Sequence, residues 1–292
     1  MARKEYRYTE EELRQLHGVL YEILEEIMRV CDKCGIRYFI IGGTAIGAHF
    51  WQRILPWDDD IDIGMTRDNY NRFLEVAPRE LKPGYFLQWV ETDPHVPFFF
   101  AKVRKNHTLF AESLFRHIDM HQGFYVDVFA FDHIPQSRWL ERLQWSALNF
   151  LNGCFISREI WQYRHCGKCE VEEPRERGFL PCLLTRLVNL VLTKRALYRL
   201  LIGVQTAFNG NRSPYCKNII TPNERVLIED VEQPQTVTLG PLQVSAPRDL
   251  EAYLHNHYPV LVKDIPEEQR VNHRPDVLCF DTRNGKGCNV QA

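Results

Sequence analysis

Four aspartates lie within five residues of one another, in the segment Trp57-Asp58-Asp59-Asp60-Ile61-Asp62. Residues two apart on a β-strand point to the same face, with Cα atoms roughly 6 to 7 Å apart, so Asp60 and Asp62 present their carboxylates side by side. Two ionised carboxylates repel at this range unless one is protonated or a cation lies between them. Oxygen ligands on a strand suit Mg²⁺, which completes its shell with water and phosphate oxygens. The pattern therefore indicates metal-dependent phosphate chemistry; the alternative is a solvated acidic turn after Pro56.

A short glycine-containing turn precedes the acidic segment. Gly42-Gly43-Thr44 lies where a predicted strand ends and a short helix begins. Glycines let a phosphate approach backbone N–H groups closely, and the N-terminus of a helix favours an anion. A Gly-Gly pair alone is also typical of an ordinary structural turn. Because the Asp60/Asp62 pair follows about twenty residues later, the turn predicts a phosphate-binding loop beside a metal site.

A third carboxylate is expected from a neighbouring strand, because two-metal phosphoryl transfer uses acidic residues that bridge the ions. Asp127, in the run Tyr125-Val126-Asp127-Val128-Phe129, is the best candidate. An acid flanked by apolar strand residues is costly to bury unless a charged group meets it. Asp132 is the less favoured alternative, since we expect it beyond the strand in a solvated turn.

The elements that position these residues follow from the apolar periodicity of the chain. Thr9 and Glu12 have the spacing of a capping box, and apolar residues at helical intervals then predict a helix over 10–34. Gly35 ends this helix, because glycine accepts a left-handed conformation. The other expected elements are strands over 37–41, 61–65, 85–90, 98–103, 108–111 and 124–129, and helices over 44–51 and 66–78.

The rest of the chain has a different pattern. Long helix-like runs cover 139–163 and 181–208, whereas short strand-like pieces at 217–220 and 235–244 precede a helical segment over 247–257. We therefore predict an α+β protein. Its parts are a mixed sheet flanked by helices over 1–135, a helical insert over 136–213, and a small C-terminal α/β portion over 214–292 that completes the fold.

Composition narrows the possible functions. The 292 residues are 45% hydrophobic and 25% charged, as in an ordinary globular protein, and the net charge of -2 provides no broad cationic field for nucleic acid. The start has no apolar leader, and no uncharged run reaches the roughly 18 residues of a membrane span, so we expect a cytoplasmic protein. The basic, amphipathic segment 181–208 leaves two alternatives, contact with the inner face of a membrane or a cap on the core.

The nine cysteines favour reduced thiols over a disulfide framework. Two pairs, Cys31-Asp32-Lys33-Cys34 and Cys166-Gly167-Lys168-Cys169, would give a four-thiolate zinc site if the fold joined them. A local site from the second pair with His165 and Cys182 is the alternative. Because the first pair lies at the predicted end of a helix, structural Zn²⁺ is the less favoured interpretation.

The sequence resembles the LicD family, which belongs to the nucleotidyltransferase-fold superfamily, over most of the chain apart from the helical insert. The resemblance is most specific in the block that joins the glycine turn to the acidic segment. It departs from the family pattern at Ala48-His49-Phe50-Trp51, where many relatives carry an arginine and a glycine-containing loop. The similar runs are Ile41-Gly42-Gly43-Thr44-Ala45-Ile46-Gly47-Ala48, residues 54–65, residues 100–104, residues 121–132, and residues 265–270 with His273.

The resemblance implies a role for each matching residue. Asp60, Asp62 and Asp127 would be the catalytic carboxylates and the metal ligands, with Mg²⁺ as the ion and Mn²⁺ as the alternative. The Gly-Gly-Thr turn would hold the phosphates of a nucleotide-diphosphate donor. His121 and His273 are expected to meet a phosphate or the acceptor glycan. Residues 1–135 would then be a nucleotidyltransferase-like core, and the C-terminal portion would supply the acceptor side.

Further side chains are implied to bind substrate. Lys102 and Arg104 alternate on a predicted strand, so both can face a diphosphate; ordinary edge-strand basic residues are the alternative, above all for Arg104. Trp57 offers an aromatic face to a quaternary ammonium, as does Trp89, and each is otherwise a core residue.

The activity implied by the resemblance is phosphotransfer. A substituted phosphate, first of all phosphocholine from CDP-choline, would move onto a hydroxyl of a cell-surface glycan or its lipid-linked precursor, such as teichoic acid or lipopolysaccharide, and CMP would leave. One alternative is transfer of ribitol or glycerol phosphate from another CDP-linked donor. The others are nucleotidyl transfer, with attack at the α-phosphate, and a non-catalytic binding protein.

Overall fold

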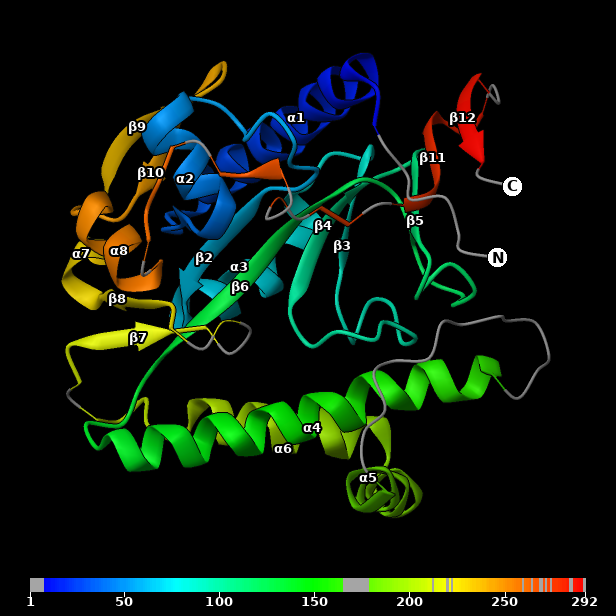
Figure 1. Ribbon diagram of the computed structural model, residues 1–292, viewed down its shortest axis with the longest axis vertical. Coiled ribbons are helices and arrows are strands. Elements are labelled where there is room, and N and C mark those ends of the chain that lie inside the picture. Colours follow the sequence, from blue (N-terminus) through cyan, green and yellow to red (C-terminus); the bar gives the residue numbers. More distant parts are fainter. Residues whose placement is uncertain are drawn as a thin grey trace.

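The computed structural model describes residues 8–290, except 165–178, 212, 219–220, 222, 259, 264, 268–269, 271, 274 and 284–285. It confirms the α+β class: a curled mixed sheet is surrounded by helices (Figure 1). No helix in the described ranges is both long enough and apolar enough to cross a bilayer.

The central sheet brings together strands from distant parts of the sequence. Its main order is β1-β2-β6-β4-β3, and β7 extends β6 and pairs with β8. Among the strand pairs of this sheet in the described residues, only β2 and β6 run parallel, and the others are antiparallel. Apolar side chains of β2, such as Ile63 and Met65, are completely buried, as the alternating pattern predicts. The strands are β1 (Phe39–Ile40), β2 (Asp62–Thr66), β3 (Tyr85–Gln88), β4 (Ala101–Lys105), β6 (Tyr125–His133), β7 (Tyr215–Lys217) and β8 (Arg225–Leu227).

Three helices of the first half pack against this sheet: α1 (Glu10–Cys34), α2 (Gly42–Trp51) and α3 (Arg67–Glu80). The predicted capping box of α1 is present, because the Thr9 hydroxyl accepts from the Glu12 amide at 3.1 Å and the Glu12 carboxylate accepts from the Thr9 amide at 2.7 Å. Gly35 ends the helix with a φ of 64°, also as predicted. Helix α3 continues two residues past Pro78, where we expected it to stop.

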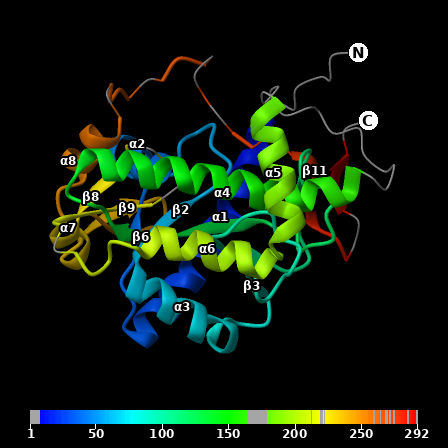
Figure 2. The same ribbon diagram turned by 90° about the horizontal axis from the view of Figure 1, so that it is seen from below.

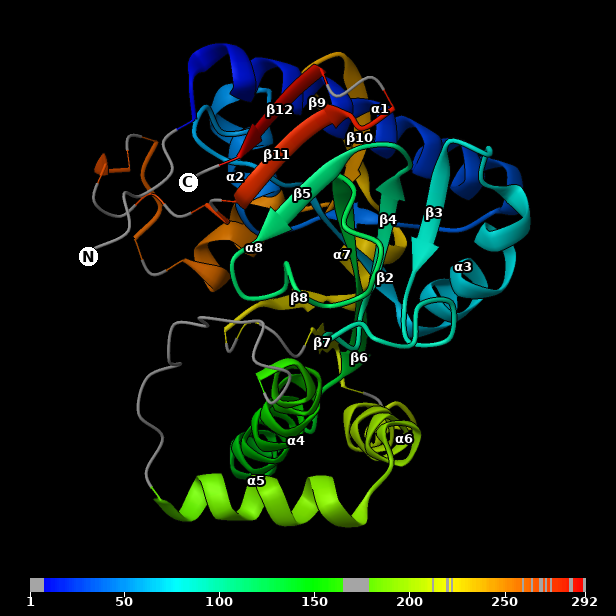
Figure 3. The same cartoon turned by 90° about the vertical axis from the view of Figure 1, so that its right-hand side faces the viewer.

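Three helices form a separate layer at the foot of the molecule in Figures 1 and 3: α4 (Arg138–Arg164), α5 (Phe179–Val191) and α6 (Lys194–Thr206). Helices α4 and α6 lie side by side, and α5 crosses α4 (Figure 2). The predicted single helix over 181–208 is wrong, because Thr193 starts a new helix by accepting a hydrogen bond from the Ala196 amide at 3.2 Å.

The C-terminal part wraps around two sides of the sheet. The expected strand over 235–244 is a hairpin, because Gly240, with a φ of 62°, makes the turn between its two strands. A second hairpin pairs with β5 (Leu109–Glu112) and holds a disulfide between Cys279 and Cys288, which corrects the expectation of reduced thiols for this pair. The elements are α7 (Ile228–Glu232), β9 (Gln235–Leu239), β10 (Leu242–Ala246), α8 (Leu250–His257), β11 (Pro275–Asp281) and β12 (Lys286–Val290).

Asp132 does not lie in a solvated turn, as we expected. It belongs to β6, is almost completely buried, and accepts hydrogen bonds from the Arg67 guanidinium at 2.8 Å and from the Asn209 amide at 2.6 Å. Strand β6 is longer than predicted because β7 pairs with its far end. Asp132 therefore joins α3, the sheet and the end of the helical layer.

Candidate metal and phosphate site

Two of the three predicted carboxylates are neighbours across a strand pair. Asp62 begins β2 and is in register with Asp127 of the parallel strand β6. The Asp127 amide donates to the Ile61 carbonyl at 2.9 Å, so the ladder begins one residue before Asp62. Hydrogen-bonded strands lie about 4.8 Å apart, and the two acids therefore face the same end of the sheet on adjacent strands. Asp60 comes from the extended segment that leads into β2.

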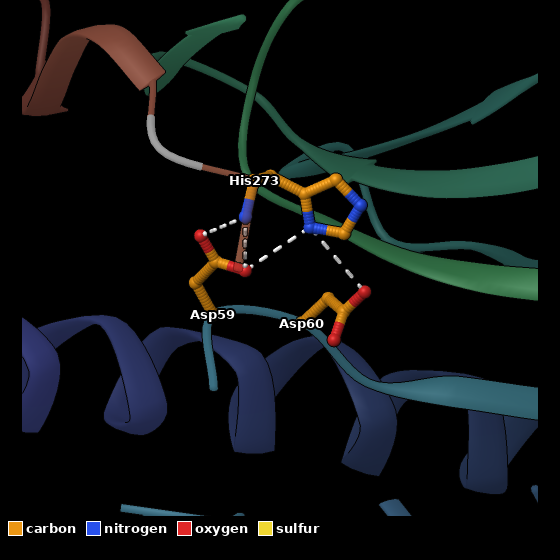
Figure 4. Close-up of side chains that lie close together, drawn as sticks. All are labelled: Asp59, Asp60 and His273. Atoms are coloured by element: carbon orange, nitrogen blue, oxygen red, sulfur yellow. Dashed lines mark hydrogen bonds and ion pairs between the residues drawn. The ribbon is translucent and has the colours of Figure 1, made fainter. Parts of the chain in front are cut away.

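Asp59 and His273 make a contact that the sequence did not predict (Figure 4). The buried Asp59 carboxylate accepts from the His273 amide at 2.8 Å and from the Tyr8 hydroxyl at 2.7 Å. The imidazole Nδ1 of His273 lies 3.0 Å from Asp59 Oδ1 and 3.5 Å from Asp60 Oδ2. Asp59 thus fixes the C-terminal segment over the acidic residues, and the imidazole of His273 lies between two carboxylates.

Burial and mutual repulsion raise the pKa values of the acidic groups. Burial raises the pKa of both Asp58 and Asp62 well above the usual range, and the negative charge of Asp60 adds to the shift. Burial also raises the pKa of Asp60 to about 6, although the charge of His273 opposes this. For His273 burial lowers the pKa, but the hydrogen bond to Asp59 and the charges of Asp60 and Asp59 outweigh it and raise the value to about 10. Such a concentration of buried negative charge favours a bound cation.

The glycine turn lies directly against the carboxylates. Gly42 has a φ of 54°, and a Cβ atom there would lie 3.5 Å from Asp62 Oδ2. A Cβ atom at Gly43 would lie only 2.7 Å from Asp58 Oδ2. The Thr44 hydroxyl accepts from the Asp62 amide at 2.9 Å, which joins the first turn of α2 to the start of β2. The two predicted motifs, glycine turn and acidic pair, are therefore in contact.

Lys102 is the charged group that meets Asp127. It lies opposite Asp127 in the antiparallel β4–β6 register, with its Nζ 2.8 Å from Oδ1 and 3.0 Å from Oδ2. Both side chains are buried, and the ammonium lies 3.4 Å from the centroid of the Tyr125 ring. The carboxylate and the aromatic face thus contact the buried Lys102 side chain on two sides.

The donor set fits a hard cation. Among the described residues, ligand atoms of Asp59, Asp60 and His273 lie within 4.8 Å of one another. Asp127 Oδ1 is buried and receives no well-directed hydrogen bond, although Lys102 is close. Carboxylate oxygens of this kind suit Mg²⁺ or Mn²⁺, so the cluster can hold a metal ion.

Arg104 and His121 belong to a buried hydrogen-bond network rather than to the carboxylate cluster. The guanidinium of Arg104 donates to the Gln88 side chain and, at 2.6 Å, to the Gly123 carbonyl. The His121 ring is 3.0 Å from Asn106 Oδ1, and its Nδ1 accepts from the Gly123 amide at 3.1 Å. Burial lowers the pKa of His121 to about 4, which keeps the ring neutral. The sequence predicted that both side chains bind substrate, whereas in the structure both form hydrogen bonds with other residues of the protein.

Trp57 lies beside the acidic segment, but its aromatic face is occupied. The Arg270 guanidinium lies 4.3 Å from the ring centroid, and Trp51 makes an edge contact at 6.3 Å. The Trp57 carbonyl also accepts from the Asn272 side chain at 3.4 Å. The face that the sequence predicted for a quaternary ammonium therefore holds a cation of the chain itself.

The first Cys-x-x-Cys pair is at the end of α1, where Cys31 is buried and Cys34 is half-buried, both as free thiols. The second pair, together with His165, lies outside the described residues. The predicted zinc sites therefore remain predictions.

Comparison with known proteins finds a family model that matches part of the chain. Residues 35–148 match LicD/FKTN/FKRP, nucleotidyltransferase domain. This range includes the glycine turn, the acidic segment and Asp127, but not His273.

Two relatives illustrate the extent of the similarity. The chain is 33% identical over 125 residues to the lipopolysaccharide cholinephosphotransferase LicD of Haemophilus influenzae, which is 42% of this chain and 45% of that protein. It is also 33% identical over 85 residues, or 29% of this chain and 26% of the other, to an uncharacterized protein of Rickettsia typhi. The chain thus spans less than half the length of either relative.

Proposed function

We propose that this chain, in which residues 35–148 form a LicD-family nucleotidyltransferase domain, is a metal-dependent phosphotransferase acting on a cell-surface glycan or its precursor. Phosphocholine from CDP-choline is the group that we favour, because one relative is a lipopolysaccharide cholinephosphotransferase. The observation that carries the proposal is the register of Asp62 with Asp127 beside the glycine turn. We place the reaction in the cytoplasm, as the sequence predicts.

Asp60, Asp62 and Asp127 would hold Mg²⁺ or Mn²⁺. When bound, the metal neutralises the diphosphate of the donor and the charge on the leaving nucleotide. The raised pKa values of Asp60 and Asp62 support this assignment, because a cation would offset the burial and the mutual repulsion that raise them.

The protein groups around the carboxylates position the reactants. Gly42 and Gly43 form the first turn of α2 and lie against Asp62 and Asp58, so a donor phosphate at this helix N-terminus would lie next to the carboxylates. Lys102 holds Asp127 in place and adds positive charge next to the phosphate. Asp127 orients the acceptor hydroxyl and accepts its proton as the new O–P bond forms; the bond from the distal phosphorus to the bridging oxygen breaks, and CMP leaves.

The choline group would compete with the chain itself for Trp57. Since Arg270 covers this ring, the quaternary ammonium takes the aromatic face only as the guanidinium moves aside. A cation–π contact of this kind contributes about 0.5 to 2 kcal/mol.

Metal-dependent release of CMP from CDP-choline tests the proposal. We expect Asp62→Asn to lower the rate by about a hundredfold or more, because it removes a ligand charge at the reacting phosphate. Asp68→Asn is the matched control, since this exposed acid lies six residues further on in α3 and makes the same change of charge. Full activity of Asp62→Asn would refute the assigned mechanism.

The products separate the alternatives. Release of CMP from CDP-ribitol or CDP-glycerol, but not from CDP-choline, would show that the proposed reaction is right and the proposed donor is wrong. Release of pyrophosphate from a nucleoside triphosphate would instead indicate nucleotidyl transfer. Stoichiometric ligand binding without turnover of any donor would identify a binding protein.

A further inference from the structure

Helix α5 turns its apolar side away from the protein. Among its outward residues, Leu190 is 83% exposed, Val191 77% and Leu187 48%. Leu183 and Leu184 extend the same side by one turn. Exposed apolar side chains that gather on one face of a helix indicate a surface that another apolar phase covers.

The opposite side of α5 carries the polar contacts to α4. The Asn189 side chain donates to the Cys154 carbonyl at 3.1 Å. The Arg158 guanidinium donates to the carbonyls of Asn189 at 3.0 Å and Leu192 at 2.6 Å. Val188 and Leu192 add a smaller apolar contact to the core of the helical layer. Helix α5 thus contacts the protein through its polar side and exposes its apolar side. A surface helix of a globular protein usually has the reverse arrangement.

In the part of the helical layer that the structure describes, the exposed charged side chains are all basic. In the described residues 136–164 and 179–211 the only acids are Glu141 and Glu159, and both are buried. Glu141 pairs with Lys217 at 3.2 Å, and Glu159 pairs with Lys194 at 2.8 Å. The exposed charged residues there are Arg138, Arg142, Arg186, Arg195 and Arg199. The described residues of the helical layer therefore expose an excess of positive charge, although the net charge of the chain is -2.

We propose that α5 lies flat on an anionic lipid bilayer, with its leucines in the headgroup region and the arginines on the lipid phosphates. Figures 1 and 3 show α5 at the outer edge of the helical layer, away from the sheet, where a planar surface can reach it. An exposed apolar helical face in a layer whose described exposed charges are basic is typical of an interfacial helix. A second copy is a poorer partner, because two arginine-bearing faces would repel each other.

Sedimentation with vesicles tests this proposal without any donor or acceptor, so its result is independent of the proposed activity. We expect the protein to bind vesicles of phosphatidylcholine with about one third phosphatidylglycerol at least ten times better than pure phosphatidylcholine. Leu187→Ser/Leu190→Ser should lower binding by about fivefold or more, because it removes apolar area without changing charge. The exposed pair Gln233→Ser/Thr236→Ser, outside the helical layer, is the matched control and should bind like the wild type.

Four results would overturn the proposal. Three come from sedimentation: no binding to the anionic vesicles, equal binding to both compositions, and undiminished binding of the leucine variant. The fourth comes from light scattering: a dimer that the leucine variant dissociates would assign this face to self-association. Unchanged thermal unfolding of the variant, expected because both leucines are exposed, shows that lost binding is not lost folding.

Discussion

Gly43 is the residue at which the glycine turn approaches the acidic segment most closely. An added Cβ atom would lie 2.7 Å from Asp58 Oδ2, closer than van der Waals contact allows. Gly43→Ala should therefore push the Asp58 carboxylate out of its position. The far end of a side chain moves at little cost, so we expect CMP release to fall about tenfold while stability drops by about 1 kcal/mol or less.

Gly18→Ala is the control for this substitution. Gly18 is exposed in the middle of α1, and an added Cβ atom would have no neighbour within 4 Å. Alanine there should raise stability by about 0.5 to 1 kcal/mol, through the better helix propensity, and leave CMP release unchanged. Denaturant unfolding measures the change in stability, and the product assay measures CMP release. Equal activity of the two variants would show that the close approach of Gly43 to Asp58 does not contribute to the reaction.

The predictability of the site differs from residue to residue. Asp62 and Asp127 could be found from strand periodicity, because local alternation decides which side chains share a face. The Lys102–Asp127 pair was anticipated only as a need for some charged partner. His273 was found by resemblance alone, and its contact with Asp59 had no local signal, because 214 residues separate the two.

Asp132 connects α3, the central sheet and the end of the helical layer, so its replacement should destabilise the contacts among all three. It binds Arg67 of α3, whose side chain is only 12% exposed, and Asn209 after α6. Asp132→Asn leaves the guanidinium buried without its counter-charge, so we expect a loss of about 2 to 4 kcal/mol in the free energy of unfolding. Chemical denaturation measures this loss directly.

Glu11→Gln provides the comparison at an exposed site. Glu11 pairs with Arg14 at 2.6 Å on the surface of α1, where the side chains are 56% and 78% exposed. Water screens this pair, and the variant should stay within about 0.5 kcal/mol of the wild type. Similar losses for both substitutions would contradict the argument that burial makes Asp132 important.

Among the elements, those with strong local signals were predicted well. The capping box and the apolar period predicted both ends of α1 correctly. Helix α4 differs from its predicted range by one residue at each end. The break between α5 and α6 was missed because the apolar period continues through Thr193, and only its capping role interrupts the helix. The pairing of β11 with β5 was also missed, since sheet partners distant in sequence leave no local pattern.

At the scale of the whole molecule, distant parts of the chain meet at Asp59. Tyr8 precedes the first helix and His273 precedes β11, yet both donate to the same buried carboxylate. The acidic segment is thus covered from both sides by residues far away in sequence. Such closure depends on the completed tertiary fold, which is why the sequence did not predict what Asp59 binds.

Hydrogen–deuterium exchange at His273 should separate the structural role of Asp59 from the role of its neighbour. The His273 amide donates to the Asp59 carboxylate, whereas the contact of His273 with Asp60 is through the imidazole, at 3.5 Å. Asp59→Ala should therefore speed exchange of this amide by about tenfold or more, because its acceptor is gone. Asp60→Ala is the matched control and should leave the amide protected, with β2 and β6 slow to exchange in both variants. Equal exchange at His273 in the two variants would show that the segment is held by other contacts, and that Asp59 is free to act as a metal ligand.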